Sequence, residues 1–227
     1  TWNVVQGGGA FANPNSPTTS VSALSIGVNR FRWSINNGPC TGVTQDDVII
    51  TVYSNTVAAA NAGPDQSICT PASSVNMNAS AAPAPASGVW TLVSGGGTIT
   101  TPGSPTTTIT GLPVGTNTFQ WTVTNGPCGT TNDQVVIRVF NANSPNANAG
   151  PDQNVCATTA TLAGNTPTAP ATGQWTLVSG SGTITAPGTP NSGVTGLGIG
   201  ANVFQWTVNN GPCANGNTSD QVTITRF

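Results

Sequence analysis

The chain is a tandem repeat, and this periodicity limits the folds that it can adopt more than any other feature. An Asn-Gly-Pro-Cys turn occurs three times, at 36–40, 124–128 and 209–213. Two sets of tryptophans and one set of cysteines recur at intervals of 88 and then 85 residues: Trp2, Trp90 and Trp175; Trp33, Trp121 and Trp206; Cys40, Cys128 and Cys213. A fixed period of this length indicates an array of small, similar domains.

The repeat also predicts where the domains begin and end. NAGPDQ opens one unit at 61–66 and another at 148–153. Short linkers rich in Ala and Asn, at 56–63 and 141–150, lead into these openings. Short connectors of this composition favour a semi-rigid rod. We therefore expect three units: the C-terminal part of a truncated repeat at 1–57, and full repeats at 58–143 and 144–227.

Each full unit has the pattern of short strands. Phe119, Trp121 and Val123 alternate with polar residues, and similar alternation recurs in about seven runs separated by turns rich in Gly, Pro and Asn. A period of two indicates a strand with one buried face. About seven such strands in roughly 85 residues predict an all-β fold of tandem, antiparallel, immunoglobulin-like β-sandwiches in an extended rod. The same alternation predicts a core built on Trp33, Trp90, Trp121, Trp175 and Trp206.

The composition excludes most classes of function. The chain contains no His, Lys or Glu, and its ionisable side chains besides cysteine are four Arg, six Asp and one Tyr. A general base near neutral pH is usually His, or a tuned Glu or Lys, so we expect neither an enzyme nor a cofactor. With 4% charged residues and a net charge of −2, the sequence has no basic stripe for nucleic acid. No apolar run approaches the roughly 20 residues of a membrane span.

The five cysteines are predicted to form disulfides within repeats. Counting permits Cys69–Cys128 with Cys156–Cys213, or Cys40–Cys69 with Cys128–Cys156. We place Cys69 and Cys128 at the same end of one sandwich, one just after the entering strand and the other in the last loop. In contrast, the last strand separates Cys128 from Cys156 by about 25 Å, beyond the reach of a disulfide. The prediction is therefore Cys69–Cys128 and Cys156–Cys213, with the partner of Cys40 upstream of residue 1.

Such bonds indicate both a stabilising role and a compartment. A disulfide that closes a loop of about 60 residues is expected to stabilise each repeat by about 4 kcal/mol on the chain-entropy model. Disulfides at this density imply an oxidising environment, so we expect an extracellular or cell-surface protein. A zinc site is disfavoured because each repeat supplies two cysteines and no histidine, and a thiol nucleophile is disfavoured because it lacks a base.

Other motifs have a structural and a functional interpretation. SGGGT at 94–98 and SGSGT at 179–183 resemble phosphate loops, but without a following Lys or helix they are expected to be turns or bulges. The tryptophans are expected in the core and not as sugar-stacking platforms. Sequons at 78–80 and 217–219 are near the number expected by chance. Four aspartates carry the carboxylate oxygens that a calcium site needs: Asp65, Asp133, Asp152 and Asp220. An Asx turn is the favoured interpretation of these aspartates, and no metal site is predicted.

Several motifs together resemble a known class of repeat. NAGPDQ followed by Cys, the strands WTLVSG and FQWTV, and TNGPC before DQVVI resemble the PKD-like or immunoglobulin-like repeats of very large cell-surface adhesins in Bacteroidota, of the gliding-motility and prey-capture types. The resemblance covers essentially the whole chain. It implies an extracellular stalk or filament that is exported by a terminal signal.

These observations predict a mechanical role. We expect a disulfide-linked stalk segment of a large secreted adhesin or filament, which projects or tethers under load. Its partners would be neighbouring repeats, parallel copies in a filament, and a surface or prey-cell ligand bound by other regions. The alternative is a glycan- or surface-binding immunoglobulin-like module, which would recognise its ligand through loops at one end.

Overall fold

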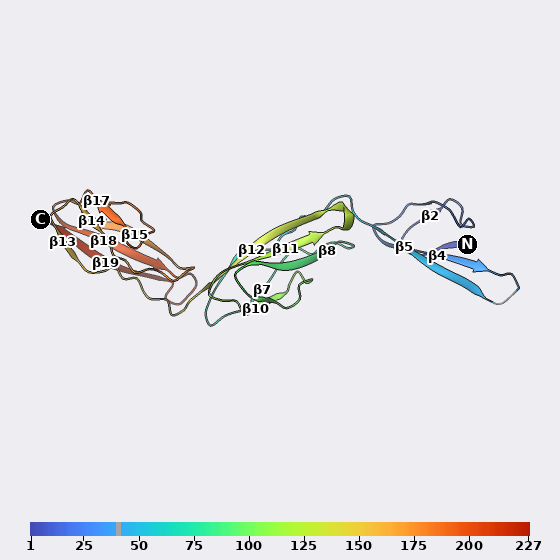
Figure 1. Ribbon diagram of the computed structural model, residues 1–227, viewed down its shortest axis with the longest axis horizontal. Coiled ribbons are helices and arrows are strands. Elements are labelled where there is room, and N and C mark those ends of the chain that lie inside the picture. Colours follow the sequence, from blue (N-terminus) through green and yellow to red (C-terminus); the bar gives the residue numbers. More distant parts are fainter. Residues whose placement is uncertain (40–41) are drawn as a thin grey trace.

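The computed structural model describes residues 1–39 and 42–227, and it confirms an all-β fold of tandem sandwiches. Three β units follow one another along the long axis of the molecule, with the N-terminus in the unit at one end and the C-terminus at the far end of the opposite unit (Figure 1). Within the described residues, each sheet lies inside one of the three predicted spans and shares no strand with another unit. The domain boundaries themselves stay a prediction.

The first repeat has two small sheets. Its strands form the sheets β1-β4-β5 and β2-β3. They are β1 (Trp2–Gln6), β2 (Ala10–Phe11), β3 (Val21–Ser22), β4 (Gly27–Asn36) and β5 (Val43–Val52).

The second repeat is a sandwich of a four-stranded sheet, β6-β12-β11-β8, and a three-stranded sheet, β7-β10-β9. Its elements are β6 (Gln66–Cys69), β7 (Val75–Asn76), β8 (Ser87–Ser94), β9 (Thr98–Ile99), β10 (Thr108–Thr110), β11 (Gly115–Thr124), the 3₁₀ turn η1 (Gly126–Cys128) and β12 (Thr130–Phe140).

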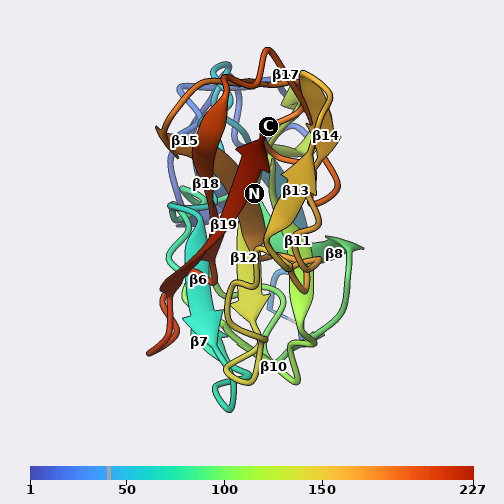
Figure 2. The same ribbon diagram turned by 90° about the vertical axis from the view of Figure 1, so that its left-hand side faces the viewer.

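The third repeat has the same plan, with the sheets β13-β19-β18-β15 and β14-β17-β16. The third repeat lies nearest the viewer in Figure 2. The strands are β13 (Gln153–Val155), β14 (Thr159–Thr161), β15 (Thr172–Ser179), β16 (Thr183–Ile184), β17 (Gly193–Thr195), β18 (Gly200–Asn209) and β19 (Asn217–Arg226).

One strand of each full repeat departs from the antiparallel pattern. β6 pairs with β12 in parallel, with Gln66 opposite Ile137 and Cys69 opposite Phe140. β13 pairs with β19 in the same way. The entering segment therefore runs beside the last strand toward the end where the chain leaves the repeat. We call this end the exit end, and the opposite one the entry end.

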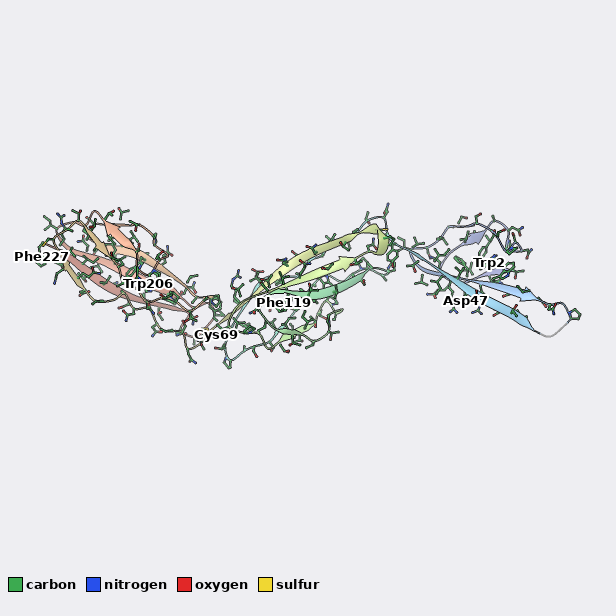
Figure 3. The ribbon with its side chains drawn as sticks, in the orientation of Figure 1. Trp2, Asp47, Cys69, Phe119, Trp206 and Phe227 are labelled. Atoms are coloured by element: carbon green, nitrogen blue, oxygen red, sulfur yellow. A yellow bond between two sulfur atoms is a disulfide. The ribbon has the colours of Figure 1, made fainter. Side chains whose placement is uncertain are left out.

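Paired tryptophans fill the core of each full repeat. Trp90 and Trp121 lie opposite each other on β8 and β11 with ring centroids 5.2 Å apart, and Trp175 and Trp206 repeat this arrangement at 5.0 Å. All four are buried, whereas Trp33 in the first repeat is half-buried. Trp206 lies inside its sandwich in Figure 3.

The alternation is incomplete in β8. Trp90 is buried, but Leu92, two residues later, is 44% exposed, although strict alternation along the strand would place both on one inner face. The pairing of β8 with β11 shifts register between Thr118 and Phe119, as at a β-bulge. The extra residue is Val93, so the irregularity begins directly after Leu92, which still lies opposite Phe119.

Candidate functional site: the joint between repeats

The disulfide of the structure joins two successive repeats, so the predicted pairing within repeats was wrong. Cys69 of the second repeat is bonded to Cys213 of the third, with Cα atoms 5.2 Å apart and a sequence separation of 144 residues. Cys128 and Cys156, the predicted partners, are free and exposed. Figure 3 places Cys69 at the junction of the two units. Cys40 lies outside the described residues.

The direction of β6 explains this correction. Cys69 is opposite Phe140, the last residue of β12, whereas Cys128 comes just before β12 begins at Thr130. The ten steps from Thr130 to Phe140 span roughly 33 Å at the rise of a strand. The entering segment has thus carried Cys69 to the exit end, where the last loop of the next repeat brings Cys213.

An aromatic ring packs on the loop glycine at both joints. A methyl group added to Gly126 would lie 2.5–2.7 Å from ring atoms of Tyr53, and one added to Gly211 would lie 2.6–2.8 Å from ring atoms of Phe140. Both glycines have positive φ, +54° and +58°, which a side chain disfavours independently. The glycine of the Asn-Gly-Pro-Cys loop is therefore required for the turn and for contact with the preceding repeat.

The asparagine before that glycine adds a hydrogen bond across each joint. Asn125 Nδ2 donates to the Ser54 carbonyl at 2.8 Å, and Asn210 Nδ2 donates to the Asn141 carbonyl at 2.9 Å. Both asparagines are buried. Each acceptor carbonyl belongs to the residue that follows the aromatic one in sequence. The loop therefore contacts two consecutive residues of the preceding repeat. The joint thus has a fixed composition: aromatic residue, carbonyl, asparagine and glycine.

The four aspartates that recur at matching positions of the two full repeats hold the entering segment against the last strand. Asp133 and Asp220 each accept a hydrogen bond from a linker amide, Ala62 N at 2.8 Å and Ala149 N at 2.9 Å. Asp65 and Asp152 accept from amides of the last strand, at 2.9 and 2.8 Å. Asp65 also pairs with Arg138 at 3.2 Å.

These contacts correct the Asx-turn interpretation of the aspartates. The turns belong to Asn61 and Asn148, whose Oδ1 atoms accept from Gly63 N and Gly150 N at 2.8 Å. Within residues 1–39 and 42–227, no three His, Cys, Asp or Glu side chains gather as for a metal ion.

The SGGGT and SGSGT segments form turns, held by a buried asparagine. Asn117 Oδ1 accepts from Gly96 N at 2.9 Å, and Asn202 Oδ1 accepts from Ser181 N at 2.8 Å. Their side-chain amides donate to backbone carbonyls, including that of Ile224 for Asn202 at 3.2 Å. One amide of each loop, Gly96 N and Ser181 N, is therefore already used by an asparagine of the same repeat.

The first repeat carries the strongest charge cluster. Asp47 on β5 accepts hydrogen bonds from Arg32 Nε at 2.7 Å and from Arg30 Nε at 2.6 Å. The Arg32 hydrogen bond is the largest influence, and together with Arg30 it lowers the pKa of Asp47 to about 2, against a smaller opposing effect of desolvation. The cluster links β4 to β5.

Neither the buried tryptophans of the full repeats nor the hollow beside β15 and β18 forms a built ligand site. Four of the predicted core tryptophans are at most 2% exposed, so their rings cannot stack on a sugar: Trp90, Trp121, Trp175 and Trp206. A hollow of about 480 Å³ beside β15 and β18 is lined by Thr, Gly, Gln and Asn and holds no ionisable side chain. The part of the chain that the structure describes includes no helix long and apolar enough to cross a bilayer.

Sequence reasoning missed the residues that complete the joint. Tyr53, Phe140 and Phe227 are spaced 87 residues apart at the end of the last strand of each repeat, and Cys69 and Cys156 share this spacing. The Asn-Gly-Pro-Cys loop recurs at 85 to 88 residues. The signal in the sequence is the aromatic residue that recurs at the end of the last strand with the same spacing as Cys69 and Cys156.

Comparison with known proteins places the second repeat beside PKD domains. Residues 62–139 match the family described as K319L-like, PKD domain. No curated protein matches the chain. Among solved structures, the chain is similar to the PKD domain from the KIAA 1837 protein, at 27% identity over 43% of this chain and 98% of that one, with a TM-score of 0.34. The PKD domain from human KIAA0319 gives 22% identity, 48% and 92% coverage, and a TM-score of 0.33. In sequence, the second repeat is therefore similar to a PKD domain.

Proposed function

We propose that this chain is a stalk segment of a large secreted cell-surface adhesin or filament, of the type found in Bacteroidota, and that it transmits tension between repeats. The observation that carries the proposal is the Cys69–Cys213 bond, which joins consecutive repeats. A bond in this position adds nothing to ligand recognition at a loop. It limits how far two neighbouring domains can separate.

The bond changes the covalent route that a pulling force follows. Tension applied at the two ends of the chain passes from Cys69 directly to Cys213, so residues 70–212 cannot be extended while the bond is intact. Most of the second and third repeats lies in this protected segment. The aromatic and asparagine contacts of the joint keep the two sulfur atoms close without load.

The remaining features agree with an extracellular spacer. A disulfide persists in an oxidising compartment. With 4% charged residues, polar Thr, Ser, Asn and Gln keep the surface soluble, and parallel copies would repel one another little. Neighbouring repeats, parallel copies and a ligand bound by other regions are the proposed partners.

Stretching single molecules tests the proposal. Chain 1–227 is pulled from its ends by optical tweezers, with and without a reducing agent. At up to 3.6 Å per residue, the 144-residue separation corresponds to roughly 500 Å of contour length. This length should be absent from the oxidised molecule and appear after reduction or in Cys69→Ser. Cys156→Ser is the matched control, because Cys156 is free and exposed.

Equal extension of the oxidised and reduced molecules would contradict the proposal. The proposal would also be contradicted if unfolding of the first repeat accounted for all the extension in both the oxidised and the reduced molecule. A ligand-dependent change of force at the joint would instead favour the glycan- or surface-binding module.

A further inference from the structure

Each joint between the described repeats buries an Asn-Gly pair, the dipeptide in which spontaneous deamidation is fastest. In this reaction the backbone nitrogen after an asparagine attacks the side-chain carbonyl carbon, and a glycine has no side chain to shield that nitrogen. The pairs are Asn125-Gly126 at the first joint and Asn210-Gly211 at the second. Asn125 is 3% exposed and Asn210 is 2% exposed. Both reactive pairs therefore lie inside the contact between two repeats.

Three contacts hold the reacting atoms of the second joint. Asn210 Nδ2 donates to the Asn141 carbonyl at 2.9 Å, so the leaving group is bound to the preceding repeat. Gly211 N, the attacking atom, donates to Asn209 Oδ1 at 2.9 Å. The ring of Phe140 lies on Gly211 and leaves no space beside it. While the joint is closed, neither the side chain nor the peptide nitrogen is free to form a ring.

The surroundings of Asn210 also reject the product of the reaction. Its Oδ1 atom is buried and has no hydrogen-bond partner in the described part of the chain. An aspartate here would lose the donor to the Asn141 carbonyl and place a negative oxygen against it. The four arginines of the chain bond to Asp47, Asp65 and the Leu197 carbonyl instead. Burial of a carboxylate without a partner is strongly unfavourable.

We propose that Asn210 and Asn125 are deamidation sites that only an open joint exposes, and that a deamidated joint does not close again. The joint is thus a one-way device: it persists while it stays closed, and an opening that lasts long enough becomes permanent. Any use of the chain that separates the repeats would expose the same atoms, so the device is independent of the proposed stalk function.

The reaction needs water and no enzyme. Gly211 N loses its proton and forms a bond to Asn210 Cγ, the bond from Cγ to Nδ2 breaks, and ammonia leaves. Water then adds to either carbonyl of the resulting succinimide ring and opens it, which gives aspartate or isoaspartate at position 210. One water is consumed and one ammonia is released, without a change of oxidation state. Isoaspartate also lengthens the backbone by one methylene, which displaces Gly211 from the ring of Phe140.

The chain contains its own reference for the intrinsic rate. Asn37-Gly38 has the same neighbours as Asn210-Gly211, an Asn before and a Pro after. In contrast, Asn37 is exposed, and no atom lies within 4 Å of where a Gly38 side chain would begin. A reaction confined to the open form is slowed by the fraction of time that the joint is open. Comparison of Asn210 with Asn37 therefore measures how well the closed joint protects its asparagine.

Peptide mapping of aged protein tests the proposal. The chain is incubated at neutral pH, and aspartate and isoaspartate at each Asn-Gly pair are quantified by mass spectrometry. In the unaltered chain we expect Asn37 to react at least roughly tenfold faster than Asn210 and Asn125, as for joints open at most a tenth of the time. Cys69→Ser combined with Phe140→Ala opens the second joint without changing its loop. The rate of Asn210 should then come within about twofold of that of Asn37.

Asn125 is the control in the same molecule. The double variant leaves its joint unchanged, so Asn125 should stay slow, whereas unfolding of the second repeat would release it as well. Tyr53→Ala should give the opposite result, a fast Asn125 and a slow Asn210. Equal rates for Asn37 and Asn210 in the unaltered chain, or no acceleration of Asn210 in the double variant, would overturn the proposal.

A charge variant tests whether a modified joint closes. Asn210→Asp imitates one product, and the Cys69–Cys213 bond re-forms only when the joint brings the two sulfur atoms together. After reduction and transfer to a glutathione redox buffer, we expect this bond to re-form roughly tenfold more slowly than in the unaltered chain. Asn154→Asp, the same change at an exposed position of β13, should not alter the rate. Equal rates in the two variants would overturn the one-way closure.

Discussion

At the scale of single residues, the glycines that lie against Trp121 and Trp206, Gly88 and Gly173, have no room for a side chain. A methyl group added to Gly173 would lie 2.1 Å from Trp206 Cζ2, and Trp206 is held against Trp175. We expect Gly173→Ala to destabilise the third repeat by about 1–3 kcal/mol, because overpacking moves a large, fixed ring. Hydrogen exchange of the β18 and β19 amides measures the change.

The control for this substitution is Gly188→Ala. The space around Gly188 is open, with the Gly173 carbonyl at 4.0 Å as its nearest neighbour, so protection of the same amides should stay within error. Unchanged protection in Gly173→Ala would show that Trp206 can move aside.

Also at the residue scale, Asp47 gives the first repeat an acid dependence with a defined sign. Its pKa is lowered in the folded state to about 2, below the ordinary value near 3.9. Because the folded state binds this proton more weakly, the stabilisation is complete above about pH 4 and is lost as the pH falls through about 2. The carboxyl carbon of Asp47 should therefore titrate near pH 2 by NMR.

Removing the dominant partner should reverse part of this shift. Arg32→Gln should raise the pKa of Asp47 toward its ordinary value, and Asp46→Asn should not, since Asp46 accepts the Asp47 amide and touches neither arginine. A midpoint near pH 4 in the unaltered chain would show that the arginine contacts do not persist in solution.

At the scale of elements, a buried asparagine connects three segments in each repeat. Asn202 on β18 bonds to the turn through Ser181 N and to β19 through the Ile224 carbonyl, while it also binds the Gly198 and Gly200 carbonyls. Asn202→Ala leaves buried backbone groups without partners, at about 1–3 kcal/mol for each group. The expected result is an earlier denaturant transition of the third repeat.

Asn154→Ala provides the comparison, because Asn154 is exposed on β13 and should leave that transition in place. An equal loss in both variants would mean that the hydrogen bonds of Asn202 do not distinguish it from a surface residue.

At the scale of the whole molecule, the joint has a noncovalent and a covalent part. Phe140→Ala removes the ring that lies on Gly211, but the Cys69–Cys213 bond still holds the two repeats together. We expect the second and third repeats to share one alignment tensor in residual dipolar coupling measurements of the unaltered chain. Phe140→Ala combined with Cys213→Ser should separate the two tensors.

The single variants distinguish the two parts. Tyr53→Ala should loosen the first joint, which has a ring contact but no disulfide among the described residues, and leave the tensors of the second and third repeats equal. A shared tensor in the double variant would show that the linker alone sets the orientation of the repeats.

The sequence by itself determined the strand-rich repeats, their turns and their tryptophan core, because these features depend on neighbours along the chain. The period of two buries Phe119, Trp121 and Val123, and all three are at most 1% exposed. Asn-Gly-Pro predicts a turn wherever it occurs. The disfavoured metal and phosphate interpretations likewise rested on residue types and their spacing.

The tertiary structure alone decided which cysteines meet. Periodicity shows which face of a strand is buried, but it does not give the direction in which the strand runs beside its partner. A parallel β6 places Cys69 at the exit end, whereas an antiparallel one would have placed it near Cys128. The parallel direction of β6 therefore explains why Cys69 bonds to the next repeat and not to Cys128 of its own. A disulfide forms between the sulfur atoms that the fold brings within reach.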